Sequence, residues 1–222
     1  MSKSLTFIEV CAGAGGLSSG FIKAGFTPVL LNDNDKTCCA TLKLNHPEAN
    51  VICGSMTDLD LSAYCNVKLD ILMGGVPCQS FSQAGKRLGL DDERGNLMLE
   101  FGKLVGVVKP KMFLIENVKG LLTHEKGATL QKILSILDIE EKYTVAYSVL
   151  NAYDYGVPQK RERVFIVGIR KDLCKTFVFP AAVDDSLRKV LKDVLVGCPV
   201  SSGYVYPDAK RKIMAQIPEG GC

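Results

Sequence analysis

Short apolar stretches of strand length alternate with stretches of helical spacing between residues 5 and 138 of this 222-residue chain. The expected strands are residues 5–10, 27–31, 51–53, 69–73 and 112–115, and the expected helices are residues 17–24, 36–45, 96–108 and 127–138. Parallel strands need a crossover long enough for a helix, so the alternation predicts an α/β fold with a doubly wound, mostly parallel sheet. Two further expected strands, residues 142–150 and 164–169, should pair as an antiparallel edge hairpin.

The composition excludes several classes of protein. A hydrophobic fraction of 47% suffices for a substantial core, and a net charge of +3 does not by itself indicate nucleic-acid binding. The sequence starts without a signal-peptide pattern, and no stretch reaches the roughly 20 apolar residues of a membrane span. Nine cysteines without a secretion signal favour a reducing cytoplasm. No Cys-x-x-Cys spacing occurs and there are two histidines, so we expect no metal site.

A glycine-rich turn joins the first expected strand to the first expected helix. It reads Cys11-Ala12-Gly13-Ala14-Gly15-Gly16. A strand, a glycine turn and a helix N-terminus together suit a nucleotide cofactor, because glycine lets a ligand approach the backbone closely. Ser18 stands where a G-x-G-x-x-G motif has its third glycine, and no Gly-Lys-Ser/Thr of a P-loop follows. The turn alone therefore also fits simple packing of a strand on a helix.

An acidic residue follows the second expected strand. Asp33 lies about 20 residues beyond the glycine turn, where a carboxylate can hydrogen-bond a ribose diol. The neighbouring Asp35 is better placed as the N-cap of the helix that begins at Lys36.

A cysteine follows the buried strand at residues 69–73. Residues 70–82 read DILMGGVPCQSFS, and Cys78 falls in the loop after the double glycine. Open α/β sheets bind ligands at the carboxyl ends of their strands, so Cys78 is a candidate nucleophile, although many free cysteines are simply small buried residues. Glu116 follows the strand at residues 112–115 in the same way. We therefore expect Cys78 and Glu116 at one edge of the sheet.

Five motifs in a fixed order make the sequence resemble the DNA (cytosine-5) methyltransferase family. They are FIEVCAGAGGLSSGFIKAGF, DILMGGVPCQSFSQAGKR, DDERGNL, ENVKGLL and DYGVPQKRERVFIVG. The resemblance implies a Rossmann-like fold and methyl transfer from S-adenosylmethionine to carbon 5 of a cytosine in double-stranded DNA. It also implies an S-adenosylmethionine-binding catalytic domain over residues 1–180.

The resemblance assigns roles to individual residues. Those implied to bind the cofactor are Cys11, Ala12, Gly13, Gly15, Gly16, Asp33, Asn34, Ser55, Met56, Gly75, Pro77 and Leu97. Those implied to act in catalysis are Cys78, Glu116, Arg161 and Arg163. Those implied to contact DNA are Gln79, Ser80, Ser82, Lys86, Arg87, Asn117 and Gln159. The polar, basic loop at residues 79–94 would close over the DNA, although its composition alone also fits a solvated connection.

The chemistry of cytosine explains why these side chains are needed. Carbon 5 is a poor nucleophile until a thiolate adds to carbon 6, the role implied for Cys78. The charge that builds on the ring then requires a proton at ring nitrogen 3, the role implied for Glu116. Arg161 and Arg163 alternate along an extended segment, so both should face the flipped-out base and its phosphate. Outside this family, Glu116 would fit a strand-end acid, and the arginines a charge pair with Glu162.

Three features depart from the family pattern. Cys11 stands where the family usually has a phenylalanine packed on the cofactor adenine, and Ser55 where an aspartate usually accepts from the adenine amino group. Residues 181–222 resemble only the lead-in to a target-recognition region, so we expect a fragment or one subunit of a split enzyme that needs a second chain. Two other interpretations stay open: an RNA cytosine-5 methyltransferase, and a non-catalytic cofactor- or DNA-binding subunit with this fold.

Overall fold

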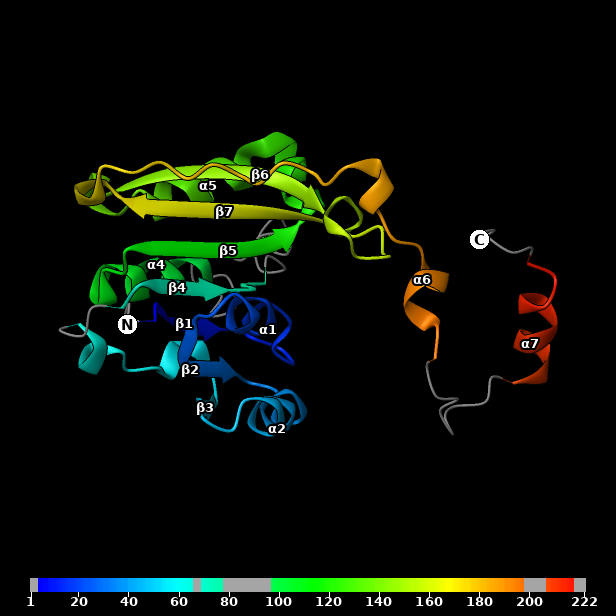
Figure 1. Cartoon of the computed structure of the whole chain (residues 1–222). Coiled ribbons are helices and arrows are strands. Elements are labelled where there is room, and N and C mark those ends of the chain that lie inside the picture. Colours follow the sequence, from blue (N-terminus) through cyan, green and yellow to red (C-terminus); the bar gives the residue numbers. More distant parts are fainter. Residues whose placement is uncertain (1–3, 66–68, 78–96, 198–206, 218–222) are drawn as a thin grey trace.

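A computed structural model describes residues 4–65, 69–77, 97–197 and 207–217. Its strands form one seven-stranded sheet in the order β3-β2-β1-β4-β5-β7-β6 (Figure 1). They are β1 (Thr6–Val10), β2 (Thr27–Asp33), β3 (Asn50–Cys53), β4 (Ile71–Gly74), β5 (Met112–Val118), β6 (Tyr143–Asn151) and β7 (Glu162–Arg170). β1 to β5 pair in parallel, whereas β7 runs antiparallel to both β5 and β6. The predicted mostly parallel sheet with an antiparallel edge hairpin is therefore confirmed.

The helices that cover the sheet begin and end within one residue of their expected bounds. They are α1 (Gly16–Lys23), α2 (Lys36–Asn45), α4 (Leu97–Val108) and α5 (Ala128–Leu137). Two further helices, α6 (Leu191–Leu195) and α7 (Asp208–Met214), follow the sheet in sequence. The start of α6 is set by the residue that precedes it. Val190 has extended backbone angles and its N–H donates to Asp193 Oδ2 at 2.8 Å, so the helix begins only at Leu191.

Each face of the sheet carries its own apolar core, because side chains alternate between the two faces along a strand. On one face, Phe101 of α4 and Ile133 of α5 belong to the same buried cluster as Phe113 of β5. On the other face, Leu42 of α2 belongs to the cluster that contains Phe7 of β1. The two cores hold the strands rigidly enough to fix the positions of the side chains at their ends.

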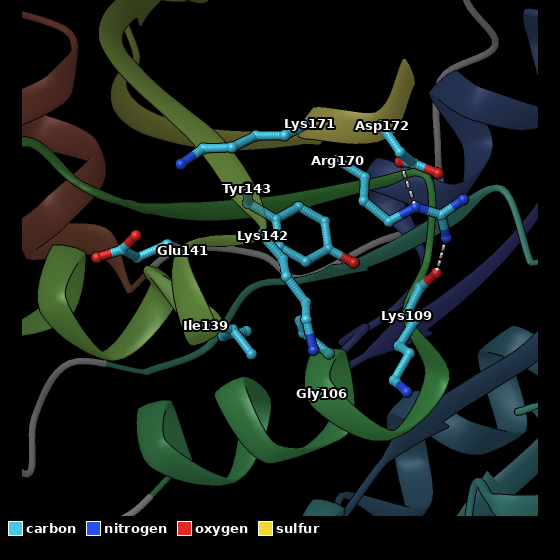
Figure 2. A pocket seen from close by; sticks show the side chains of 10 residues that line it. Gly106, Lys109, Ile139, Glu141, Lys142, Tyr143, Arg170, Lys171 and Asp172 are labelled. Atoms are coloured by element: carbon cyan, nitrogen blue, oxygen red, sulfur yellow. Dashed lines mark hydrogen bonds and ion pairs between the residues drawn. The ribbon is translucent and has the colours of Figure 1, made fainter. Parts of the chain in front are cut away.

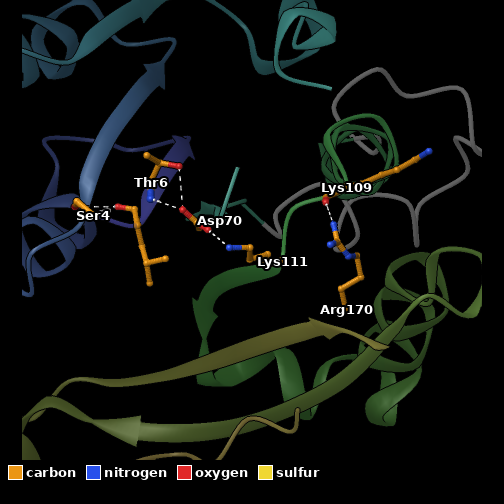
Figure 3. Close-up of polar contacts among 7 residues, drawn as sticks. Ser4, Thr6, Asp70, Lys109, Lys111 and Arg170 are labelled. Carbon is orange, nitrogen blue, oxygen red and sulfur yellow. Dashed lines mark hydrogen bonds and ion pairs between the residues drawn. The ribbon is translucent and has the colours of Figure 1, made fainter. Parts of the chain in front are cut away.

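A buried carboxylate ties together the amino ends of three strands. Asp70, just before β4, is 8% exposed. Its Oδ2 accepts from the N–H and the hydroxyl of Thr6 at 2.8 and 3.2 Å, and its Oδ1 accepts from Lys111 Nζ at 2.6 Å (Figure 3). Burial alone would raise the pKa of Asp70, but the Lys111 ammonium and the Thr6 N–H outweigh it, and the pKa is lowered.

The chain beyond Val190 extends away from the layers of sheet and helices, whereas Val183 and Arg188 still contact Asp154 in the connection between β6 and β7. α6 and α7 stand apart from the sheet in Figure 1, and the described residues from 191 to 197 and from 207 to 217 are all exposed. Their exposed apolar side chains are Leu191, Val194, Leu195, Val196, Ile213, Met214 and Ile217. Among the residues that the structure describes, no helix combines the length and apolar character needed to cross a membrane.

Candidate active site

Two adjoining hollows lie at the carboxyl ends of the parallel strands. The smaller, of about 240 Å³, is here named the aspartate hollow and is lined by Cys11, Gly13, Asn32, Asp33, Asn34, Ser55, Met56, Gly75, Pro77 and Leu97. The larger, of about 450 Å³, is named the glutamate hollow and is lined by Glu9, Cys11, Ala12, Gly13, Gly16, Leu17, Gly75, Glu116, Arg161 and Phe165. Cys11, Gly13 and Gly75 line both, so one ligand can extend from the first hollow into the second.

The glycine turn forms the wall that the hollows share. Cys11, Gly13 and Gly15 have positive φ angles of 51°, 56° and 88°, so the chain turns sharply after β1. The Gly15 N–H donates to the Ala12 carbonyl at 3.0 Å and closes the turn. A Cβ on Gly15 would lie 2.8 Å from Leu42 Cδ2. Gly15 therefore serves the contact between α1 and α2, and it lines neither hollow.

Asp33 connects the tip of β2 to the glycine turn. Its Oδ2 accepts from the Gly13 N–H at 2.7 Å, and its Oδ1 accepts from the Asp35 N–H at 2.9 Å. The carboxylate thus holds the turn in place while it also lines the aspartate hollow. Asp35 caps α2 as expected, because its side chain accepts from the N–H groups of Thr37 and Cys38.

Sequence reasoning missed Asn32, which also lines the aspartate hollow. Asn32 is 1% exposed, and its Nδ2 donates to the carbonyls of Ile52 and Gly54 at 3.1 and 2.9 Å. Its Oδ1 is buried and has no hydrogen-bond partner within the described part of the chain. A buried unpaired acceptor costs about 1–3 kcal/mol, and a donor on a ligand would remove that cost. The signal in the sequence is an amide at the end of an otherwise apolar strand.

Three charged side chains meet at the glutamate hollow. Glu116 Oε1 on β5 lies 3.0 Å from Arg163 Nε and 3.7 Å from Arg161 Nη2. Alternate residues of an extended chain share a face, so Arg161, Arg163 and Phe165 project to the same side, and Phe165 stands opposite Glu116 in the β5–β7 register. The Glu116 side chain is 26% exposed, so a ligand can reach it.

Two predicted DNA contacts can be located. Asn117 is 5% exposed; its Nδ2 donates to the Val76 carbonyl at 2.9 Å, and its Oδ1 accepts from the Val118 N–H at 2.8 Å. It therefore ties the end of β5 to the segment that follows β4. Gln159 is exposed in the turn before β7. Their contacts with DNA stay predictions.

A buried carboxyl group in the wall of the glutamate hollow is a second feature that sequence reasoning missed. Glu9 on β1 is 2% exposed and accepts a hydrogen bond from the fully buried hydroxyl of Ser18 on α1. Burial raises the pKa of Glu9 to about 7, although the Ser18 hydrogen bond opposes this effect. Burial also raises the pKa of the Cys11 thiol to about 11, with smaller contributions from the Asp33 and Glu9 charges. The signal for Glu9 is an acid within an apolar strand.

The hollows gather most of the residues predicted for the cofactor and for catalysis. All predicted cofactor residues except Gly15 line one or both hollows, and Glu116 and its two arginines meet at one of them. Pro77, directly before Cys78 in the chain, lines the aspartate hollow. The predicted residues outside the described ranges are Cys78, Gln79, Ser80, Ser82, Lys86 and Arg87. Within the described ranges, no group of three or more His, Cys, Asp or Glu side chains could hold a metal ion.

Comparison with known proteins decides the family. The model of the C-5 cytosine-specific DNA methylases matches residues 5–214. The chain belongs to this family. Among curated relatives of the methylase, the type II methyltransferase M.PspPI of Psychrobacter sp. is 44% identical over 229 residues. M.Eco47II of Escherichia coli is 43% identical over 226 residues, and M.AquIA of Picosynechococcus sp. is 47% identical over 193 residues.

The methylase chain spans about half the length of several of these relatives. The M.PspPI match covers 99% of this chain but 54% of the relative, and the M.Eco47II match covers 97% and 53%. The M.AquIA match covers 81% of this chain and 76% of the relative. This chain therefore corresponds to only part of the length of M.PspPI and M.Eco47II.

Solved structures share the fold. A prophage-encoded protein from E. coli, described as a DNA modification methyltransferase, matches 89% of the methylase chain and 56% of its own, with a TM-score of 0.74 and 28% identity. Spodoptera frugiperda DNMT2 matches 82% and 54%, with a TM-score of 0.64. At 24% identity, this second likeness shows the fold alone.

Proposed function

We propose that this chain is the catalytic part of a DNA methyltransferase that methylates carbon 5 of a flipped-out cytosine through a covalent bond to Cys78. The observation that carries the proposal is the meeting of Glu116 with Arg161 and Arg163 in a hollow that adjoins the glycine turn. Membership of the cytosine-5 methylase family over residues 5–214 supports the reaction class.

The aspartate hollow fits S-adenosylmethionine. Asp33 presents a carboxylate suited to a ribose diol, and Asn32 Oδ1 is a buried acceptor that a ligand N–H or O–H would satisfy. Met56, Pro77 and Leu97 offer apolar surface to the adenine. When bound, S-adenosylmethionine supplies an electrophilic methyl group next to the glutamate hollow.

The side chains then divide the work on the cytosine ring. The Cys78 thiolate adds to carbon 6, and the electron pair displaced from the carbon 5–carbon 6 double bond moves toward ring nitrogen 3. Glu116, once protonated, provides the proton that stabilises this charge. Arg163 holds the Glu116 carboxyl group at 3.0 Å, while the half-exposed Arg161 is available to the base or its phosphate. After methyl transfer, water takes the carbon 5 proton and the sulfur leaves carbon 6 as the Cys78 thiolate. The proton on ring nitrogen 3 returns to Glu116, which restores the aromatic ring and the acid.

We further infer that residues 1–180 form the catalytic domain and that residues 181–222 lead toward a recognition region. The longer relatives support this division, as does the apolar surface of α6 and α7. Exposed apolar patches favour contact with further protein, either a continuation of the chain or a second subunit. A bacterial cytoplasm with access to DNA is the compartment that this role requires.

Methyl transfer from radiolabelled S-adenosylmethionine to duplex DNA tests the proposal. The chain is assayed alone and joined to the remaining half of M.PspPI, and a 5-fluorocytosine duplex is used to trap the covalent intermediate. We expect robust transfer and trapping in the joined form only. Cys78→Ser should abolish both, and Cys174→Ser, which changes an exposed cysteine, should leave both intact. Trapping that survives Cys78→Ser would contradict the mechanism, and a preference for transfer RNA over DNA would contradict the substrate.

A further inference from the structure

A third hollow lies near the amino ends of the parallel strands, at the opposite end from the aspartate and glutamate hollows. It is named here the basal hollow, and its volume is about 530 Å³. It lies between the end of α4, the short helical turn Ile139–Glu141, the start of β6 and the end of β7 (Figure 2). Because β7 is antiparallel, its end lies beside the start of β5, at the amino ends of the parallel strands. The volume is within the range of about 300–1,000 Å³ typical of small-molecule sites.

Cationic side chains dominate the rim of the basal hollow. They are Lys109, Lys142, Arg170 and Lys171, against two acids, Glu141 and Asp172. Asp172 Oδ1 already accepts from Arg170 Nε at 2.7 Å. Arg170 Nη1 also donates to the Lys109 carbonyl, which fixes the guanidinium at the rim (Figures 2 and 3). The guanidinium has more N–H donors than these two contacts use, so it can still bind an anion.

The interior of the basal hollow is apolar. Gly106 of α4 and Ile139 supply the accessible part of this surface, and the buried Val105 and Tyr143 lie behind it. The Tyr143 hydroxyl donates to the Pro110 carbonyl at 2.8 Å, which leaves the ring to act as an apolar wall. Figure 2 shows the Lys142 side chain extending toward Gly106, so a cation and a flat apolar surface lie close together. A ligand with a ring and an anionic group matches this combination.

Two residues in the walls of the basal hollow have a costly backbone conformation. Lys109 and Glu141 have positive φ angles of 51° and 55°. Lys109 ends α4, where its N–H donates to the Val105 carbonyl at 2.8 Å, and glycine is the usual residue at such a position. A side chain there costs about 1–2 kcal/mol. Residues with strained backbone angles are often found at functional sites. Cys11, which lines both the aspartate and the glutamate hollow, also has a positive φ angle.

We propose that the basal hollow binds a phosphate-bearing ligand of nucleotide size. Arg170 is the fixed donor to the phosphate, the positive charges of Lys109, Lys142 and Lys171 around the rim attract it, and the ring lies against Gly106. Lysine and arginine are the usual partners of phosphate in proteins. The hollow shares no lining residue with the catalytic edge. The proposal therefore adds a second ligand site to the methylase, independent of methyl transfer.

Calorimetric titration with adenosine 5′-monophosphate tests the proposal, with S-adenosylhomocysteine present in excess to occupy the catalytic edge. Adenosine and inorganic phosphate are titrated separately. We expect saturable binding of the nucleotide that exceeds binding of either part. Lys171→Glu combined with Lys142→Glu should weaken it at least tenfold. The matched control combines Lys36→Glu with Lys43→Glu on the exposed surface of α2, so that it changes the same number of charges. It should leave the affinity for the nucleotide unchanged.

Several results would overturn the proposal. One is the absence of saturable binding to chain whose circular dichroism shows that it is folded. Another is an equal loss in the control, because the effect would then come from overall charge. Equal affinities for adenosine and the nucleotide would show that the phosphate does not contribute to binding. Displacement of the nucleotide by a short DNA duplex would reassign the hollow to the DNA backbone.

Discussion

The buried Glu9 carboxyl group makes the stability of this protein depend on pH in a direction unusual for an acid. Its pKa is raised from 4.5 to about 7 in the folded chain, chiefly by burial. Below pH 4.5, the group is protonated in both folded and unfolded chains. Between these values the unfolded chain ionises first, so stability falls as pH rises. Above the folded pKa the loss is constant, at about 3 kcal/mol, because one pKa unit corresponds to about 1.4 kcal/mol.

Glu9→Gln removes the titration and keeps a side chain that the Ser18 hydroxyl can still contact. Urea denaturation of the wild type and the variant at pH 4.5 to 8 measures the effect. The free energy of unfolding of the variant should increase relative to that of the wild type as pH rises, with most of the increase between pH 5 and 7. Glu48→Gln removes a charge from an exposed site and should show no such trend. A stability difference that stays flat with pH, or grows toward acid, would refute the assignment of Glu9 as a buried, partly protonated acid.

Three further predictions, the first with a matched control, concern contacts around the sheet and are tested by thermal or urea denaturation. Gly15→Ala places a methyl group 2.8 Å from Leu42 Cδ2 at a φ of 88° and should destabilise the fold by about 2 kcal/mol. Its control, Gly20→Ala, lies in open space within α1 and should stabilise the fold by up to about 1 kcal/mol. Similar effects of the two substitutions would contradict the tight contact. Asp70→Asn should cost about 1–3 kcal/mol at neutral pH, and the cost should shrink as pH falls below 3.8, because the lowered pKa stabilises only the ionised form. A cost that does not change as pH falls would count against the ion pair. Gly168→Ala, whose methyl group would lie 2.1 Å from Phe113 Cε1, should cost about 3 kcal/mol or prevent folding, and a neutral result would mean that the ring moves freely.

The spacing of apolar residues predicted the strands and helices because the buried positions of each element follow its own backbone period. The run at residues 112–115 is apolar throughout, and β5 is buried on both faces there. The alternation in β7 likewise matches two cores, with Val164 and Ile166 in one and Phe165 and Val167 in the other. Local patterns were sufficient because burial in these elements repeats with the period of the backbone.

Contacts between distant segments could not be read from such patterns. Gly168 looks like an interruption of a strand, and only the β5–β7 register shows that the Phe113 ring lies over it. Asn32 and Glu9 are single polar residues in apolar strands, and their importance depends on Ile52, Gly54 and Ser18 elsewhere in the chain. The roles of Glu116 and its arginines came from the family motifs, because spacing alone does not specify which strands become neighbours.

The reversed direction of β7 has a consequence for the order in which the site is assembled during synthesis. All five parallel strands and Glu116 are complete by Val118, yet the arginines that pair with Glu116 lie at the start of β7, more than forty positions later. A nascent chain halted before Gln159 would contain Glu116 and the residues that line the aspartate hollow, but neither arginine that pairs with Glu116. Because β7 is antiparallel, its start and not its end lies beside Glu116, so the pairing of Glu116 with the arginines can form once residues 161–163 have been synthesised.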